Sequence, residues 1–294
     1  MSDLKLYSPK TIRDIMDRHG FTFSKKFGQN FLIDKNIIDG ICDGADIGEE
    51  DGIIEIGPGI GVLTYEMAKR AGKVVSIEID KTLIPVIEEN MEEFDNFKLI
   101  NEDVMEIDLG KLIEEEFKGM NVKVVANLPY YITTPIIMKL LEENLKIDRI
   151  VVMVQKEVAE RLSSVPGKKS YGAITLAVNY YSEAETILKV PRSVFMPSPN
   201  VDSAVVEFKI YDEKPVEAEN PDLMFKIIKA AFGQRRKTIL NAINSADLGI
   251  DKETIKNIFE ENGIDSRRRG ETFSIKEFAE LSDLFGKEIE SRNS

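Results

Sequence analysis

One short segment, Asn127-Leu128-Pro129-Tyr130, has the composition of a site for a flat ring that carries an amino group. It follows an apolar run, Val122–Ala126, that we expect to be a β-strand. The Asn127 side-chain oxygen and the Leu128 carbonyl are two acceptors, which match the two N–H donors of an adenine amine. Pro129 restricts the turn, and Tyr130 can stack on a base. Chemistry at such an amine would depend on positioning and electrostatics rather than on a strong base.

A second aromatic residue, Phe195, begins a proline-containing segment, Phe195–Ser203, that precedes an alternating strand pattern. Its ring could form the other wall of a site for an adenine taken out of its helix. The alternative is that Phe195 fills the core beneath a loop.

A glycine-containing turn and two acids indicate a site for a nucleoside cofactor. Gly57 opens the turn Gly57–Gly61, which lies between a strand and a helical pattern. Glu78 lies near the end of the next strand, and Asp103 follows the third. Such carboxylates can accept the ribose hydroxyls and an adenine amine, and the ends of parallel strands meet in one crevice. Gly61 comes one place early for a dinucleotide fingerprint, which disfavours an NAD-dependent oxidoreductase.

Short apolar runs alternate with helical patterns through the first half of the chain, which predicts a mostly parallel sheet with helices on both faces. We expect an α/β, Rossmann-like domain over residues 1–212 and a small all-helical domain over 213–294, joined by the acidic segment Asp212–Pro221. The expected strands cover Gly52–Ile56, Lys73–Ile79, Phe97–Ile100, Val122–Ala126, Arg149–Val154, Glu185–Val190 and Ser203–Tyr211.

The composition restricts the class of protein. The 294 residues carry a formal net charge of −13, with one cysteine, Cys42, and one histidine, His19. We therefore expect no disulfide and no metal site built on cysteine or histidine. We find no apolar run of membrane-spanning length and no signal peptide, so we expect a cytoplasmic protein that does not bind a membrane. For the oligomeric state, a monomer is the default expectation. Basic residues gather at Lys25–Lys26, Lys168–Lys169, Arg235–Lys237 and Arg267–Arg269.

With these residues in view, the sequence resembles the ribosomal RNA adenine dimethyltransferases, and within them the bacterial KsgA type. The resemblance extends over nearly the whole chain. It rests on the segments Lys26–Leu32, Glu55–Gly59, Asn127–Tyr130, Gln155–Val158, Tyr171–Gly172, Phe195–Ser203, Ala231–Thr238 and Arg267–Glu271.

The resemblance implies a fold, a reaction and a set of contacts. The fold is the Rossmann-like methyltransferase fold with a seven-stranded, mostly parallel sheet. The reaction transfers methyl groups from S-adenosylmethionine, without a metal, to N6 of two adjacent adenosines near the 3′ end of 16S rRNA in the 30S subunit or its precursor, with a role in subunit biogenesis. The implied residues are Asn30, Leu32, Gly57, Glu78, Asp103 and Asn127 for the cofactor, and Asn127, Leu128, Tyr130 and Phe195 for the adenine.

The helical domain is expected to position the RNA through Gln234, Arg235, Arg236, Lys237 and Arg267–Arg269, although a solvated helix face with ion pairs remains an alternative. Two further readings stay open. One is an erythromycin-resistance methyltransferase that acts on large-subunit rRNA, against which the segments Gln234–Thr238 and Arg267–Glu271 argue. The other is a nonenzymatic assembly factor that retains the pocket.

Overall fold

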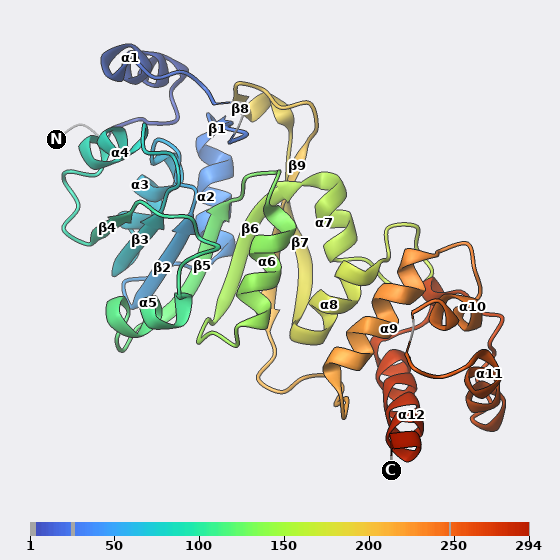
Figure 1. Ribbon diagram of the computed structural model, residues 1–294. Coiled ribbons are helices and arrows are strands. Elements are labelled where there is room, and N and C mark those ends of the chain that lie inside the picture. Colours follow the sequence, from blue (N-terminus) through green and yellow to red (C-terminus); the bar gives the residue numbers. More distant parts are fainter. Residues whose placement is uncertain (1–3, 25–26, 247, 294) are drawn as a thin grey trace. The chain divides into compact units, whose positions relative to one another are not determined.

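The computed structural model describes residues 4–24, 27–246 and 248–293, so the basic residues Lys25 and Lys26 lie outside the described residues. Its contacts divide the chain into two units (Figure 1). We name them the sheet unit, which comprises the residues up to Ala159 together with Glu183–Ile210, and the helical unit, which comprises Glu160–Ser182 and the residues from Tyr211 on.

The sheet unit is built on one large sheet. Among the described residues, seven strands form it in the order β4-β3-β2-β5-β6-β9-β7. Strands β4, β3, β2, β5 and β6 pair in parallel, and β9 runs antiparallel to β6. This order confirms the predicted Rossmann-like, mostly parallel sheet. The strands are β2 (Asp51–Ile56), β3 (Lys73–Ile77), β4 (Phe97–Ile100), β5 (Asn121–Asn127), β6 (Arg149–Gln155), β7 (Ser182–Val190) and β9 (Ser203–Ile210).

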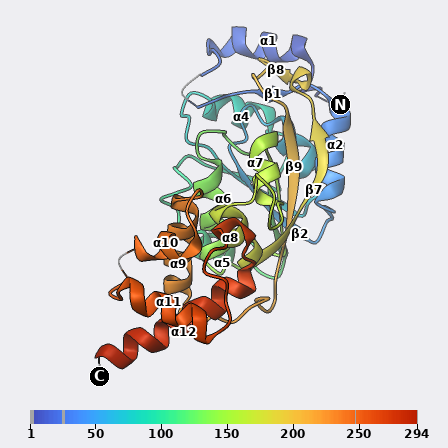
Figure 2. The same ribbon diagram turned by 90° about the vertical axis from the view of Figure 1, so that its right-hand side faces the viewer.

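Both faces of this sheet are covered, which explains why its strands read as continuous apolar runs. Every residue of β2 is buried. Ile53 belongs to a core cluster with residues of α2 (Lys35–Gly44), α3 (Val62–Ala68) and α4 (Ile84–Asn90). The next residue along β2 points to the opposite face, where α5 (Leu109–Glu116) and α6 (Thr133–Glu142) lie (Figure 2). Helix α7 (Lys156–Leu162) follows β6.

A second, two-stranded ribbon holds the N-terminal segment beside the loop before β9. Strand β1 (Phe31–Leu32) pairs antiparallel with β8 (Phe195–Met196), which follows the short helix η1 (Arg192–Val194). By its residue types alone, the segment 28–32 is expected to be a polar turn that leads into a helix. Its pairing with β8 depends on a partner more than 160 residues away, which local patterns do not reveal.

Three helices of the sheet unit were not singled out from the sequence: α1 (Pro9–His19), α2 and α5. The ends of α5 carry a signal that could have found it, because the Asp108 side chain caps the helix by accepting from Lys111 N at 2.9 Å. Helix α1 is tied to α4 by Arg18 and His19, which both pair with Glu89.

The helical unit contains α8 (Ala173–Tyr181), α9 (Pro221–Gly233), α10 (Ile239–Asn244), α11 (Lys252–Glu261), η2 (Gly270–Thr272) and α12 (Ile275–Asn293). Residues 160–182, which we placed in the first domain, cluster instead with this unit. The reason is packing, because Tyr171, Leu176 and Tyr180 are buried in one core with Ile227 and Phe278. The second boundary lies at Ile210/Tyr211.

Glu55 of β2 is a carboxyl group buried inside the sheet unit, with 1% of its surface exposed. Its Oε2 accepts a hydrogen bond from Thr64 Oγ1 of α3 at 2.6 Å and another from Ser76 Oγ of β3 at 2.7 Å. Burial raises the pKa of Glu55 to about 7, although the two hydroxyl donors lower it. The native protein therefore binds a proton between about pH 4.5 and 7 that the unfolded chain has released.

We predict that Glu55→Gln removes a pH-dependent loss of stability. Because the folded pKa lies above the unfolded value, the wild-type free energy of unfolding falls as the pH rises through this range and stays low above it. The gain in stability from the substitution should be larger at pH 8.5 than at pH 5, by roughly 2–3 kcal/mol. Urea denaturation of both proteins at the two pH values measures this difference. An equal effect at both would contradict the prediction.

Candidate functional site

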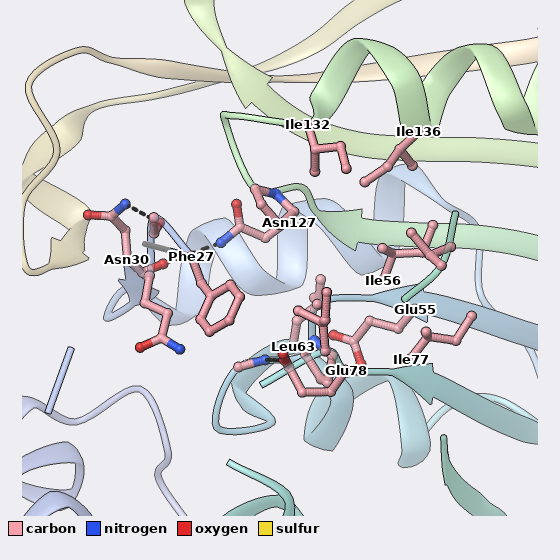
Figure 3. Close-up of a pocket in the computed structure, with 18 of the residues that line it drawn as sticks. Phe27, Asn30, Glu55, Ile56, Leu63, Ile77, Glu78, Asn127, Ile132 and Ile136 are labelled. Carbon is pink, nitrogen blue, oxygen red and sulfur yellow. Dashed lines mark hydrogen bonds between the residues drawn. The ribbon is translucent and has the colours of Figure 1, made fainter. Parts of the chain in front are cut away.

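The carboxyl ends of the parallel strands open into a cavity of about 310 Å³ (Figure 3). Among the segments that line it, four lie at or just after the ends of parallel strands, and a fifth comes from near the N-terminus. They are Gly57–Gly59 after β2, Glu78–Ile79 after β3, Glu102–Val104 after β4, Asn127 with Pro129 at the end of β5, and Phe27–Leu32 from the N-terminal segment. All six residues expected to contact a cofactor therefore line one cavity: Asn30, Leu32, Gly57, Glu78, Asp103 and Asn127.

The turn after β2 requires glycine because its backbone lies in the left-handed region and close to other atoms. The φ angles of Gly57 and Gly59 are 72° and 65°, which side chains disfavour. A Cβ atom on Gly59 would also lie 2.9 Å from the Phe31 ring. The turn thus passes close to β1 and leaves the backbone exposed to the cavity.

Glu78 faces the cavity as a nearly buried carboxyl group, with 5% of its surface exposed. Backbone amides hold it in place, since Oε1 accepts from Asp80 N at 2.8 Å and Oε2 from Gly59 N at 3.3 Å. Burial raises its pKa to about 7, while these amide donors lower it. Each oxygen retains a further lone pair, so the group can accept two hydroxyl donors from a ligand.

Asp103 lies on the same rim, half-buried, and its Oδ1 accepts from Met105 N at 2.9 Å. Its Oδ2 accepts no hydrogen bond from the residues that the structure describes and is therefore available to an amine. Tyr131 also lines the cavity, and partial burial, followed by the charges of Asp103 and Glu78, raises the pKa of its hydroxyl.

The Asn127 amide is oriented by the N-terminal segment. Its Nδ2 donates to the Asn30 carbonyl at 3.3 Å, and Asn30 Nδ2 donates in turn to the Gly28 carbonyl at 2.7 Å (Figure 3). This assignment of the amide leaves Asn127 Oδ1 as a free acceptor. The Leu128 N–H donates to Met153 O at 3.1 Å, whereas the Leu128 carbonyl accepts nothing from the described residues. Two acceptors, Asn127 Oδ1 and the Leu128 carbonyl oxygen, therefore belong to neighbouring residues of this turn.

Three residues expected to hold the adenine, Leu128, Tyr130 and Phe195, are not among those that line the cavity. The hydroxyl of Tyr130 lies 2.7 Å from Ser203 Oγ, at the start of β9. Phe195 is 3% exposed and belongs to the core cluster beneath β8. In this conformation the Phe195 ring supports the segment rather than facing a ligand.

Sequence reasoning missed several residues of the cavity, among them Phe27, Gln29, Glu55, Ile79 and Tyr131. Ile79 and Tyr131 are large side chains that remain 41% and 56% exposed. Exposed apolar surface beside a cavity is a signal for a ligand, but only the structure reveals exposure. The sequence signal available for Phe27 and Gln29 was their place beside Asn30 in the same segment.

The basic residues expected to contact RNA differ in what surrounds them. Arg235 pairs with Glu271 at 3.0 Å, Arg268 with Glu277 at 2.5 Å, and Arg267 with Asp265 at 3.0 Å. Arg236 and Lys237 are exposed and form no ion pair with the residues that the structure describes.

Within residues 4–24, 27–246 and 248–293, no helix is both long and apolar enough to cross a membrane. No group of three metal-ligating side chains is found in these ranges.

Comparison with known proteins agrees with this geometry. The family model described as ribosomal RNA adenine dimethylase matches residues 20–283. The chain is 50% identical over 285 residues to ribosomal RNA small subunit methyltransferase A of Alkaliphilus oremlandii, covering 97% of this chain and 99% of that protein. The protein of the same name from Clostridioides difficile is 48% identical over 288 residues, with 98% and 99% covered.

Solved structures are similar as well. A dimethyladenosine transferase from Plasmodium falciparum superposes with a TM-score of 0.75 at 25% identity, covering 87% of this chain and 98% of that one. The 23S rRNA methyltransferase ErmE, at 23% identity and a TM-score of 0.67 over 87% and 100% of the two chains, shares the fold. The family match over most of the chain, together with the relatives at about half identity, shows that this chain belongs to the ribosomal RNA adenine dimethylase family.

Proposed function

We propose that this enzyme transfers methyl groups from S-adenosylmethionine to N6 of two adjacent adenosines near the 3′ end of 16S rRNA, in the 30S subunit or its precursor. The observation that carries the proposal is the convergence of Glu78, Asp103 and Asn127 on one cavity, with Asn127 Nδ2 already bonded to Asn30. We further propose that it works as a monomer in the cytoplasm and contributes to small-subunit biogenesis.

The residues around the cavity fit S-adenosylmethionine. Glu78 would accept the ribose hydroxyls, because each of its oxygens keeps a free lone pair and backbone amides fix the group in place. Asp103 Oδ2 would accept the adenine amine of the cofactor, and the exposed side chain of Ile79 would pack on its ring. Gly57, Asn30 and Leu32 would surround the remainder. When bound, this cofactor supplies a methyl group carried on a positively charged sulfur.

The turn at Asn127 would hold the amine of the target. Asn127 Oδ1 and the Leu128 carbonyl would accept its two N–H groups, which keeps electron density on N6 and fixes its direction. Tyr130 would stack on the base. After one transfer the amine retains a single N–H, so one acceptor is enough for the second. Since the proton becomes acidic only as the new bond forms, water can remove it.

The substrate can be tested directly. Purified enzyme with labelled cofactor is offered 30S particles from cells that lack the modification and, separately, 50S particles. We expect label only in 16S rRNA, and mass spectrometry of the digested RNA should identify N6,N6-dimethyladenosine. Label confined to 23S rRNA, as an erythromycin-resistance enzyme would give, would overturn the proposal. Normal binding to 30S without any turnover would favour the nonenzymatic alternative.

We predict that Asn127→Ala lowers kcat by about 10²–10³-fold, because it removes an acceptor that is preorganised for the amine. The rate of methyl transfer to 30S particles measures the effect. Thr134→Ala, at an exposed position of α6, is the control and should leave the rate unchanged. A variant that retains the wild-type kcat would exclude Asn127 from the reaction.

We also predict that cofactor affinity depends on the ionisation of Glu78. With its pKa raised to about 7, the free enzyme carries a protonated carboxyl at pH 6 and a better acceptor at pH 8. Binding should therefore tighten as the pH rises from about 6 to 8. Glu78→Gln should weaken binding at pH 8 by about 10–100-fold, the contribution of charge-assisted hydrogen bonds, and flatten the pH dependence.

Isothermal titration calorimetry with S-adenosylmethionine measures this prediction. Glu106→Gln, an exposed acid close to Asp103 that does not line the cavity, is the matched control. If the Glu78→Gln variant bound as tightly as the control at both pH values, Glu78 would have no part in the cofactor site.

A further inference from the structure

Three loops of the helical unit meet at one place, although they are far apart in the sequence. They are residues 163–171 before α8, residues 234–238 between α9 and α10, and residues 265–272 around η2. Gly167 N donates to Glu271 O at 3.0 Å, which joins the first loop to the third. Ile239 N donates to Arg268 O at 2.7 Å, which joins the third loop to the start of α10. We call this group of loops the loop junction.

The loop junction is strongly basic within an acidic protein. The chain as a whole has a net charge of −13. The three loops carry only two carboxylates, Asp265 and Glu271. Their cationic side chains are Lys168, Lys169, Arg235, Arg236, Lys237, Arg267, Arg268 and Arg269. A local excess of positive charge of this kind attracts a polyanion even where the total charge is negative.

Arg235 acts inside the loop junction. Its Nε and Nη2 both donate to Glu271 Oε2, at 3.1 Å and 3.0 Å, and its Nη1 donates to the Lys169 carbonyl at 3.1 Å. The guanidinium thus bridges all three loops and uses three of its five N–H donors. The charge of Arg235 is balanced by Glu271, so its principal contribution is to hold the loop that carries Lys169.

Arg268 is engaged in the same way. Its Nη1 pairs with Glu277 at 2.5 Å, its Nη2 donates to Thr272 O at 2.6 Å, and its guanidinium lies 3.9 Å from the centre of the Phe273 ring. Arg267 differs, since its side chain is 86% exposed and its partner Asp265 is exposed too. A pair of that kind is weak and leaves Arg267 able to exchange partners.

Lys168 and Lys169 have no such partners. Both are exposed, and their ammonium groups form no ion pair or hydrogen bond with the described part of the chain. Together with Gly167, Arg235 and Glu271 they line a common surface pocket. The loop behind them is well anchored, because Tyr171 is 1% exposed and its hydroxyl donates to Phe273 O at 2.9 Å. Two unneutralised cations are therefore presented on a fixed loop.

We propose that the loop of residues 163–171 binds phosphates of the substrate RNA through Lys168 and Lys169, and that Arg235 is a positioning residue for this loop. The proposal rests on the proposed function, which supplies RNA as the substrate. Cations spread over three adjacent loops suit the repeated charges of an RNA backbone better than a single small anion, and lysine contacts to phosphate carry no sequence preference.

The lysines are tested by comparing Lys168→Gln/Lys169→Gln with Lys252→Gln/Lys256→Gln, which makes the same charge change at exposed positions of α11. Methyl transfer to 30S particles is measured at several salt concentrations. We expect the first variant to raise KM for 30S by about tenfold or more, to leave kcat and cofactor affinity unchanged, and to reduce the salt slope of binding by about 1–2. The α11 variant should behave as wild type.

Equal KM and salt slope in the two variants would overturn the role of the lysines while leaving the proposed function intact. If instead the wild type failed to methylate 30S at all, the proposed function would fail first. The two failures are thus distinguishable.

The role of Arg235 is tested by combining Arg235→Ala with the lysine substitutions. Arg235→Ala alone should raise KM for 30S, because it removes the bonds to Glu271 and to the Lys169 carbonyl. In the Lys168→Gln/Lys169→Gln background the same substitution should raise KM little further, because the loop that Arg235 holds no longer presents cations. An equal fold-increase of KM in both backgrounds would show that Arg235 contacts phosphate directly, and would overturn its assignment as a positioning residue.

Discussion

The structure depends on one geometric constraint: the carboxyl ends of neighbouring parallel strands must finish at the same edge of the sheet. Strands β2, β3, β4 and β5 are adjacent and parallel, so the residues that follow them share one crevice. Buried strands such as β2 can maintain this arrangement because helices cover both faces. Glu78, Asp103 and Asn127 meet for this reason, without any direct contact between them.

The N-terminal segment completes the site from outside the sheet. Pairing of β1 with β8 brings residues 28–32 to the cavity, where the Asn30 carbonyl accepts from Asn127 Nδ2. This single hydrogen bond decides which atom of the amide remains free. An oxygen that accepts is what an amine needs, so a contact made by a distant segment determines the chemistry that the end of β5 can support.

Buried carboxyls give the site its electrostatic character. Glu55 and Glu78 both have pKa values near 7, since burial disfavours their charge. Hydroxyl groups oppose this effect at Glu55 and backbone amides at Glu78. In the helical unit, nearby carboxylates neutralise the charges of Arg235 and Arg268, and these two residues hold the loops together. The exposed side chains of Lys168 and Lys169 have no such carboxylate partner among the described residues. Total charge alone therefore says little about where an acidic protein can meet RNA.

The sequence by itself determined the alternation of strands and helices, the glycine turn after β2 and the acids at the strand ends, because these depend on local periodicity and on backbone conformations that only certain residues adopt. The resemblance to a known family added Asn30 and Leu32. Tertiary structure alone decided the rest. Residues 160–182 join the helical unit because Tyr171 and Leu176 find their apolar partners there, and Phe195 is buried because it packs in the core of the sheet unit. Which arginines are neutralised depends on carboxylates from distant parts of the chain, as with Arg235 and Glu271, which are 36 residues apart. Burial and pairing between distant segments are properties of the folded chain, so no local pattern encodes them.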